Sequence, residues 1–331
     1  MKNILLIATG GTIASKPTDV GLVPSITSEE IIEFVPQIEK LCKISTIQLM
    51  NIDSSNMSPE RWIKIANCIR ENYEKYDGFV ITHGTDTLAY TGSALSYLIQ
   101  NSAKPIVLTG SQKSIYLQDT DARKNLYDSF IFVCDEKSSG VHIVFDSKVI
   151  VGTRARKTRT HSYNAFDSID YPIVAMIFNE KVIYYINEEI DKPVKFYDEL
   201  NSNVNIIKLI PGISNKVFEF VGEISDVIVV EGFGVGGLPT YDDEKSLFKT
   251  IQKLTQQGKI IVFTTSVPHE GSNIEVYQVG NEIKGSINLL ENFNMTLEST
   301  VCKLMWITAK TKVFSEVEKM FYESISHDIV Y

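Results

Sequence analysis

The sequence predicts an α/β protein with two parts. The N-terminal domain has a doubly wound, mainly parallel sheet, and a smaller α/β domain follows it. Three observations predict this. Short apolar runs alternate with helical patterns up to about residue 150, the alternation fades until about 205 and then resumes, and 331 residues suffice for two cores. We therefore expect domains over 1–190 and 206–331, joined by a linker over 191–205.

The N-terminal strands are expected in continuous apolar runs, which are typical of a sheet covered on both faces. These runs are "ILLIA", "ISTIQLM", "GFVITHG", "PIVLTGS" and "GVHIVFD", beginning at residues 4, 44, 78, 105 and 140. Helix-start signals lie between them. Thr27 followed by Glu30 fits a capping box, and Ser58 before Pro59 fits an N-cap with proline in the first turn. Further helical patterns cover 86–100 and 121–133.

The C-terminal domain repeats the alternation on a smaller scale. Strands are expected in "VNIIKLI", "DVIVVEGFG" and "KIIVFTT", beginning at residues 204, 226 and 259. A helix is expected near "DDEKSLFKTIQKL", residues 242–254, with further helices towards the C-terminus. The polar stretch before residue 205 lacks a strong period, so we interpret it as the linker.

Composition argues against two classes of partner. The net charge of −9 disfavours nucleic acid, which basic patches bind, and no run approaches the roughly 18 apolar residues of a membrane span. The apolar N-terminus meets Gly10 and Gly11 too early for a signal peptide, so we expect a cytoplasmic protein. Its four cysteines form no C-x-x-C pair, which favours buried thiols over a zinc site: Cys42, Cys68, Cys134 and Cys302.

The residues after each strand are the candidates for a ligand site, because parallel sheets bind ligands beyond the carboxyl ends of their strands. Hydroxyl groups, glycines and acids recur there: Thr9 to Thr12, Asp53 to Ser55, Thr82 to Thr87, Thr109 to Gln112 and Gly232 to Gly237. Thr12 and Thr85 are candidate nucleophiles, and Asp86 is a carboxylate beside the second. Taken singly, each threonine fits the cap of a turn or helix better than a nucleophile, because threonine favours caps.

Other motifs leave alternatives open. His83 lies between Thr82 and Gly84 without a G-x-S-x-G elbow, so we expect a structural role for it. The basic stretch "VGTRARKTRTHSYNAF" fits a solvated loop, unless its lysine reaches Asp86. Gly232, Gly234 and Gly237 spell G-x-G-x-x-G after a strand, which allows a dinucleotide site, although the expected helix begins several residues later.

Two stretches resemble the signature motifs of the bacterial L-asparaginases. These are "LIATGGTIA" (6–14) and "GFVITHGTDTL" (78–88). The same order continues in "NIDSSNM", "PIVLTGSQ", "GTRARKTRTHSYNAF", "FGVGGLP" and "LMW", so the resemblance covers essentially the whole chain, and it is nearest to cytoplasmic, type I-like members. It implies hydrolysis of L-asparagine to L-aspartate and ammonia without a metal or cofactor. It also implies a homodimer or homotetramer with active sites between subunits.

The resemblance implies roles for matching positions. Thr12 would attack the side-chain amide and form an acyl intermediate, with Thr85, Asp86 and Lys157 as the base assembly. A further group would bind substrate: Asp53, Ser54 and Ser55 at the α-carboxylate and α-amino groups, with Thr85 and Asp86 beside them, and Ser111 at the amide.

Two positions depart from the family pattern. Leu22 takes the place of a loop tyrosine that orients the attacking threonine in many members, and Arg156 replaces a small hydroxyl residue of an allosteric site. Two other functions compete with the asparaginase hypothesis: a related amidase or glutaminase, and a dinucleotide- or ligand-binding protein. We expect no additional N-terminal domain of the kind that amidotransferase relatives carry, because the first motif begins at residue 6.

Overall fold

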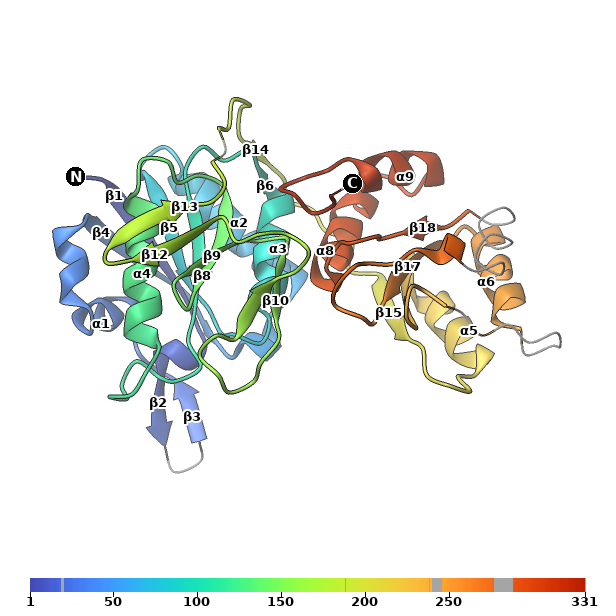
Figure 1. The fold of residues 1–331 in the computed structure, drawn as a ribbon, viewed down its shortest axis with the longest axis horizontal. Helices are drawn as coiled ribbons and strands as arrows, with labels where there is room; N and C mark the ends of the chain where they lie inside the picture. The colour runs from blue at the N-terminus through green and yellow to red at the C-terminus, as the bar shows by residue number, and fades with distance from the viewer. Residues whose placement is uncertain (19–20, 188, 238, 240–245, 277–287, 331) are drawn as a thin grey trace. The chain divides into compact units, whose positions relative to one another are not determined.

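The computed structural model describes residues 1–18, 21–187, 189–237, 239, 246–276 and 288–330. The chain divides into two compact units, Met1–Asp198 and Glu199–Tyr331 (Figure 1). The expected linker over 191–205 contains the short strand β14 (Lys195–Phe196), which pairs with β6 (Ile99–Gln100), and the first residues of β15 (Val204–Lys208).

The first unit is built on a sheet of eight described strands in the order β13-β12-β9-β8-β7-β5-β1-β4. They are β1 (Asn3–Gly10), β4 (Lys43–Ile52), β5 (Gly78–Thr82), β7 (Ile106–Thr109), β8 (Val141–Phe145), β9 (Lys148–Val151), β12 (Ala175–Phe178) and β13 (Lys181–Tyr184). The strands from β4 to β8 pair in parallel, which confirms the mainly parallel sheet. The strands from β9 to β13 add an antiparallel end, in the region where the sequence alternation fades.

The strand order creates a switch point between β1 and β5. β1 pairs with β4 on one side and with β5 on the other, so the chain leaves β1 in one direction and later returns to its opposite edge. In doubly wound sheets, ligands bind in the crevice at such a reversal of strand order. The residues after β1 and β5 therefore face the position where a ligand is expected.

Helices cover the sheet of the first unit and fix its strands. They are α1 (Ser28–Glu33), α2 (Pro59–Asn72), α3 (Leu88–Leu98) and α4 (Ala122–Cys134). The capping box of α1 is confirmed, because Thr27 accepts from the Glu30 N–H and Glu30 accepts from the Thr27 N–H. Ser58 stands at the N-cap of α2, but its hydroxyl makes no cap hydrogen bond. Side chains of α1 and α4 share one buried core with β1, β5 and β7.

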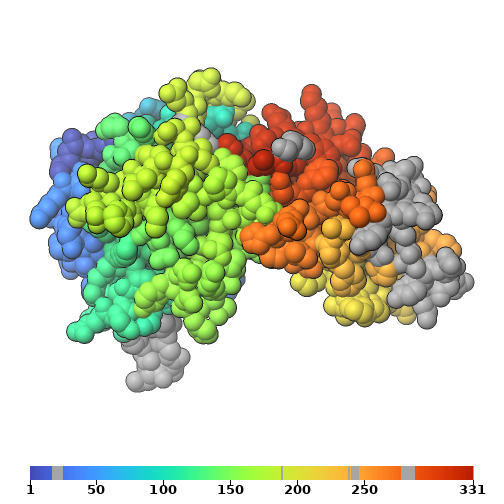
Figure 2. All heavy atoms as spheres, in the orientation of Figure 1, coloured from blue at the N-terminus to red at the C-terminus, as the bar shows by residue number. Residues whose placement is uncertain are grey.

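The hairpin β12–β13 forms one edge of this sheet and lies on the face shown in Figure 2, coloured yellow-green. β12 buries Ala175 and Ile177 and exposes Met176 and Phe178. Burial alternates along both strands of the hairpin, so neither resembles the continuously buried strands β5 and β7.

The second unit has a parallel sheet in the order β15-β16-β17-β18. Its further elements are β16 (Val227–Gly232), β17 (Ile260–Thr265), β18 (Leu290–Glu291), α5 (Asn215–Ile224), α6 (Leu247–Gln256), α8 (Leu297–Thr308) and α9 (Phe314–Tyr322). Residues 242–245 of the expected helix lie outside the described residues, and α6 covers the rest. A fully buried ion pair, Lys303 Nζ to Asp328 Oδ2 at 2.7 Å, links α8 to the segment after α9.

Short elements complete the first unit: β2 (Ser15–Thr18), β3 (Gly21–Pro24), β10 (Ala155–Lys157), β11 (Phe166–Ser168), and 3-10 turns at Thr12–Ala14, Pro36–Lys40 and Ser54–Asn56. The second unit has one such turn at Ile274–Val276. Within the described ranges, no helix combines the length and the apolar character needed to cross a bilayer.

Candidate active site

Glycines let the turns after three strands pack backbone to backbone at the switch point. A Cβ on Gly11 would lie 2.3 Å from the Gly84 nitrogen, and Gly11 also has φ +81°, which favours glycine. A Cβ on Gly84 would lie 2.5 Å from the Ser54 hydroxyl. Any larger residue would push these turns apart. The glycines therefore bring together the residues that follow β1, β4 and β5.

Thr12 and Thr9 lie in the same motif but have different environments. Thr12 is the first residue of the 3-10 turn after β1 and is half-buried. No hydrogen bond joins its hydroxyl to any residue that the structure describes. Thr9 is buried, and its hydroxyl donates to the Thr82 carbonyl at 2.8 Å. The Thr9 hydroxyl is thus occupied by a structural hydrogen bond, whereas that of Thr12 is available for a ligand.

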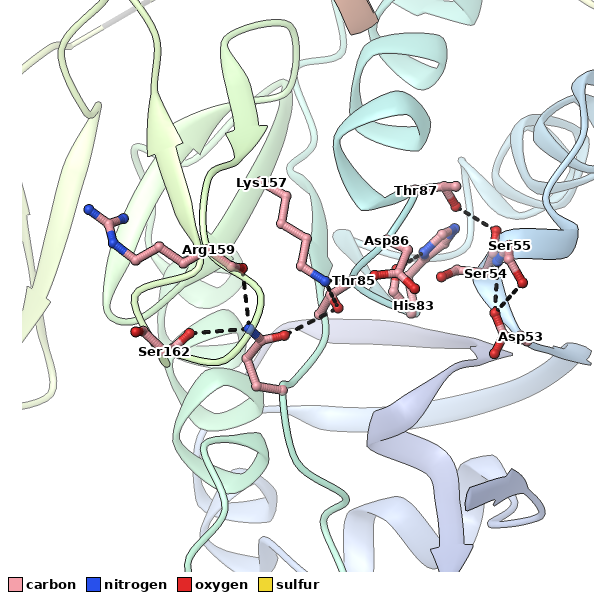
Figure 3. Close-up of polar contacts among 12 residues, drawn as sticks. Asp53, Ser54, Ser55, His83, Thr85, Asp86, Thr87, Lys157, Arg159 and Ser162 are labelled. Atoms are coloured by element: carbon pink, nitrogen blue, oxygen red, sulfur yellow. Dashed lines mark hydrogen bonds and ion pairs between the residues drawn. The ribbon is translucent and has the colours of Figure 1, made fainter. Parts of the chain in front are cut away.

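Lys157 reaches from β10 to the turn after β5. Its Nζ lies 2.8 Å from the Thr85 hydroxyl and 2.7 Å from Asp86 Oδ1 (Figure 3). The Lys157 side chain is 19% exposed and that of Asp86 is 67% exposed. Thr85 is buried. The three side chains thus form a contiguous polar group, in which the carboxylate is open to an incoming cation.

The turn after β4 presents a second carboxylate. Asp53 Oδ1 accepts from the Ser55 N–H at 2.8 Å and from the Ser55 hydroxyl at 2.7 Å. These two hydrogen bonds, the hydroxyl first, lower the pKa of Asp53. Asp53 and Ser55 are exposed, whereas Ser54 is buried and its carbonyl accepts from Thr87. In the view of Figure 3, Thr85 and Asp86 lie between Lys157 and this turn.

The turn after β7 holds Ser111, which the resemblance places at the amide end of the substrate. Ser111 is buried and its hydroxyl donates to the Lys113 carbonyl within the same loop. The neighbouring Gln112 instead directs its side-chain amide towards Thr85. Gln112 belongs to the stretch expected at the site, but sequence reasoning gave it no role of its own. Its position directly after a parallel strand was the signal that could have singled it out.

His83 is fully buried in a directed chain of hydrogen bonds. Its Nδ1 lies 2.7 Å from the Gly84 carbonyl, which only accepts, so Nδ1 carries the proton. Its Nε2 then accepts from the Thr91 hydroxyl at 2.9 Å, and Thr91 accepts from the Trp62 indole at 2.9 Å. These contacts confirm the expected structural role. Burial lowers the pKa of His83 to about 4, so the ring is neutral at pH 7.

We expect this histidine to make the fold sensitive to acid. The unfolded chain takes up a proton near the ordinary histidine value of about 6.5 and the folded chain only near 4, so stability is present above about 6.5 and is lost as pH falls towards 4. Between pH 7 and pH 5 this component amounts to about 2 kcal/mol. In urea unfolding, the free energy of unfolding of His83→Gln should fall correspondingly less than that of the wild type between pH 7 and pH 5. The matched variant His161→Gln changes an exposed histidine and should lose as much stability as the wild type. Equal losses of stability in the wild type and His83→Gln would contradict the prediction.

The glycine motif at the end of β16 does not form a phosphate cradle in the part that the structure describes. The N–H groups of Gly236 and Gly237 both donate to the Phe233 carbonyl, at 2.8 and 2.7 Å, so they point into their own turn. α6 begins at Leu247, ten residues beyond Gly237. Anion binding by such a motif needs free N–H groups at a helix that opens directly from the loop. In the described part of this loop, the dinucleotide alternative therefore finds no structural support.

The two departures from the family pattern lie on short strands. The Leu22 backbone pairs with Pro17 in the hairpin β2–β3, and the Leu22 side chain lies outside what the structure describes, as do residues 19 and 20 between the two strands. Arg156 lies on β10, paired through its backbone with Asp167, directly before Lys157. Among the described residues, no cluster of three histidine, cysteine or acidic side chains could hold a metal ion.

Comparison with known proteins agrees with this arrangement along both units. The profile described as "Asparaginase, N-terminal" matches residues 3–190, and "Glutaminase/Asparaginase C-terminal domain" matches 203–321. The chain is 36% identical to an L-asparaginase of Thermococcus kodakarensis, over 98% of both chains. A solved structure titled as the thermostable L-asparaginase from that organism superposes with a TM-score of 0.93, covering 99% of each chain at 35% identity.

Two more distant relatives extend the comparison. A probable cytoplasmic L-asparaginase from Campylobacter jejuni has a TM-score of 0.84 at 26% identity, with 98% of this chain and 100% of that chain covered. A component of the glutamyl-tRNA(Gln) amidotransferase of Pyrococcus abyssi is 31% identical over 99% of this chain and 77% of its own length. The similarity thus spans two related branches of amide chemistry.

Proposed function

This chain belongs to the asparaginase family of amidohydrolases, and on that premise we propose that it hydrolyses the side-chain amide of L-asparagine to L-aspartate and ammonia through an acyl-threonine intermediate. One observation carries the proposal. Lys157, Thr85 and Asp86 are in hydrogen-bond contact beside the turn that holds Thr12. A hydroxyl nucleophile needs such a polar assembly next to it in order to lose its proton.

Charge supports a small zwitterionic substrate. Asp86 and Asp53 are exposed carboxylates at the same end of the sheet, and either can bind an α-ammonium group. In our proposal, the segment Asp53 to Ser55 also holds the α-carboxylate through N–H and hydroxyl donors, and Ser111 lies at the amide end of the substrate. Because Ser111 donates to Lys113, its side chain supports the loop shape there.

The reaction that we propose has two steps. Thr12 Oγ1 attacks the amide carbon, the hydroxyl proton passes to the departing nitrogen through the base assembly, and ammonia leaves behind an aspartyl ester on Thr12. Water then attacks the ester carbon, gives one proton to the Thr12 oxygen, and releases aspartate. Backbone N–H groups at the glycine turns are candidates to stabilise the oxyanion of both steps.

Lys157 acts as the proton carrier in this scheme. In the structure its three-donor ammonium contacts the Asp86 carboxylate and the Thr85 oxygen. Lys157 gives a proton to the departing nitrogen and takes up the Thr12 hydroxyl proton by way of Thr85, so its own protonation is the same before and after the step. Thr85 then links Lys157 to the reacting groups.

The family and its relatives suggest the wider setting. We propose a homodimer or homotetramer, in keeping with the resemblance, and a cytoplasmic location like that named for the Campylobacter jejuni protein. The related amidase or glutaminase function stays a second candidate, because the amidotransferase relatives match 99% of this chain.

Ammonia release tests the proposal directly. We expect saturable release from L-asparagine, at least about tenfold higher kcat/KM than for L-glutamine, and little release from D-asparagine, because the acid and donor groups fit one stereoisomer and one chain length. A sigmoidal dependence of the rate on substrate concentration would also show that the sites are cooperative, although Arg156 replaces the small hydroxyl residue of the family's allosteric site. Release from L-glutamine alone would favour the glutaminase alternative. No release, together with thermal stabilisation by NAD but not by L-aspartate, would favour the dinucleotide-binding alternative.

A further inference from the structure

The side-chain amide of Gln112 joins Thr85 to the loop of residues 158–165. We infer that Gln112 is a positioning residue, which fixes the direction of the Thr85 hydroxyl and makes it depend on the shape of that loop. The kinetic consequences of this inference rest on the proposed function, whereas the hydrogen-bond contacts of Gln112 are independent of it. Neither the family signatures nor the resemblance assigned a role to this side chain.

The orientation of the amide follows from its partners. Gln112 Nε2 lies 3.4 Å from the Arg159 carbonyl and 3.2 Å from the Ser162 carbonyl. Carbonyl oxygens only accept, so the NH2 group must face the loop. The amide oxygen is then turned the other way and lies 3.4 Å from the Thr85 hydroxyl. The loop therefore determines which end of the amide Thr85 meets.

This orientation determines where the Thr85 hydrogen points. The Lys157 ammonium, 2.8 Å away, has three donors and no acceptor, so it cannot receive the hydroxyl hydrogen. Among the described contacts of this hydroxyl, only the Gln112 oxygen can accept it. The hydrogen thus points to Gln112 and a lone pair points to Lys157. When Lys157 gives up a proton, its nitrogen gains a lone pair, and the Thr85 hydrogen can turn from Gln112 to Lys157 and be passed on.

The backbone of Gln112 is held in place by the buried carboxylate of Asp121. The backbone N–H of Gln112 donates to both carboxylate oxygens of Asp121, at 3.1 and 2.9 Å. The backbone N–H of Lys113 donates to Asp121 Oδ1 at 3.0 Å. The Asn125 side chain adds hydrogen bonds to Asp121 and to the Gly110 carbonyl, at 3.2 and 3.0 Å. A side chain so fixed at its backbone can orient a neighbour without a large loss of entropy.

The loop that carries Gln112 also contacts the turn of Thr12. The Ile115 N–H donates to the Ile13 carbonyl at 3.3 Å, and the Ser114 hydroxyl donates to the Ser15 carbonyl. One loop therefore touches the residues beside both candidate nucleophiles. The loop of residues 158–165 is closed by the Thr158 N–H, which donates to the Ala165 carbonyl at 2.9 Å. Gln112 is the side chain that joins the two loops.

The test replaces the amide and keeps the length of the side chain. Gln112→Met should lower kcat for L-asparagine by about tenfold or more while KM stays within about threefold, because alignment of reacting groups is lost and substrate contacts are kept. Gln118→Met is the matched control. It lies in the same loop, its side chain is exposed, and we expect wild-type kinetics. A kcat within twofold of wild type in Gln112→Met, or a loss confined to KM, would overturn the inference.

Two further readouts separate this inference from the proposed function. In Gln112→Met, amide hydrogen exchange over 158–165 should accelerate, and a crystal structure should show Thr85 in a second rotamer. If the wild type releases no ammonia, the proposed function fails, and these two measurements still decide the inference. An unchanged exchange rate together with a single Thr85 rotamer would show that Gln112 does not position this hydroxyl.

Discussion

Thr12→Ala is expected to lower kcat for L-asparagine by about ten-thousand-fold or more, with folding unchanged. Thr12 is the first residue of a 3-10 turn, and the N-cap of this turn, Gly11, packs against Gly84. Alanine at position 12 therefore fits the same backbone without a clash. Loss of a nucleophile removes the covalent route and leaves only the effects of binding and electrostatics. Initial rates of ammonia release, with circular dichroism and a thermal unfolding curve, measure both parts of the prediction.

Two variants of the same motif serve as controls for Thr12. Thr12→Ser keeps a hydroxyl at the reacting position and should retain much of the activity. Thr9→Val removes the buried hydroxyl that donates to Thr82, so we expect near-normal kcat and a stability loss of about 1 kcal/mol. Near-normal turnover in Thr12→Ala would exclude Thr12 as the nucleophile.

Thr85→Ala is expected to lower kcat by about a thousandfold, the middle of the range for general acid–base groups. In the proposed mechanism, its hydroxyl is the contact through which Lys157, 2.8 Å away, reaches the reacting groups. The Lys157–Asp86 ion pair at 2.7 Å does not need this hydroxyl, so the fold and the carboxylate at the site should persist. Binding of L-aspartate, measured by calorimetry, should therefore weaken far less than kcat.

Thr82→Val is the matched control for Thr85. It lies on β5, three residues before Thr85, and its buried hydroxyl finds no partner among the described residues, so its loss should leave kcat and stability nearly unchanged. Rapid acid quench followed by peptide mass mapping then identifies the acylated residue. We expect the aspartyl adduct on the peptide that contains Thr12. An adduct on the peptide that contains Thr85 would reverse the two roles.

Much of the fold was predictable because local patterns encode it. The continuous apolar runs at β1, β5 and β7 marked buried parallel strands, and Thr27 with Glu30 marked the start of α1. The antiparallel end of the sheet was not predicted. Burial alternates along β12, but its side chains are apolar on both faces, so the sequence shows no alternation of polarity that would mark a half-buried strand.

The sequence by itself determined which residues stand at the carboxyl edge of the sheet. Glycines such as Gly11 and Gly84 are needed wherever turns touch, and that need can be read from the chain. Only the tertiary structure decided which side chains meet there. The family resemblance grouped Lys157 with Thr85, but spacing along the chain did not, since they lie 72 residues apart. Neither indicated that Gln112 meets both Thr85 and the Ser162 carbonyl, 50 residues further on. Such contacts depend on how β10 and the loop after β7 pack around the sheet, because hydrogen bonds require distances that spacing along the chain does not set.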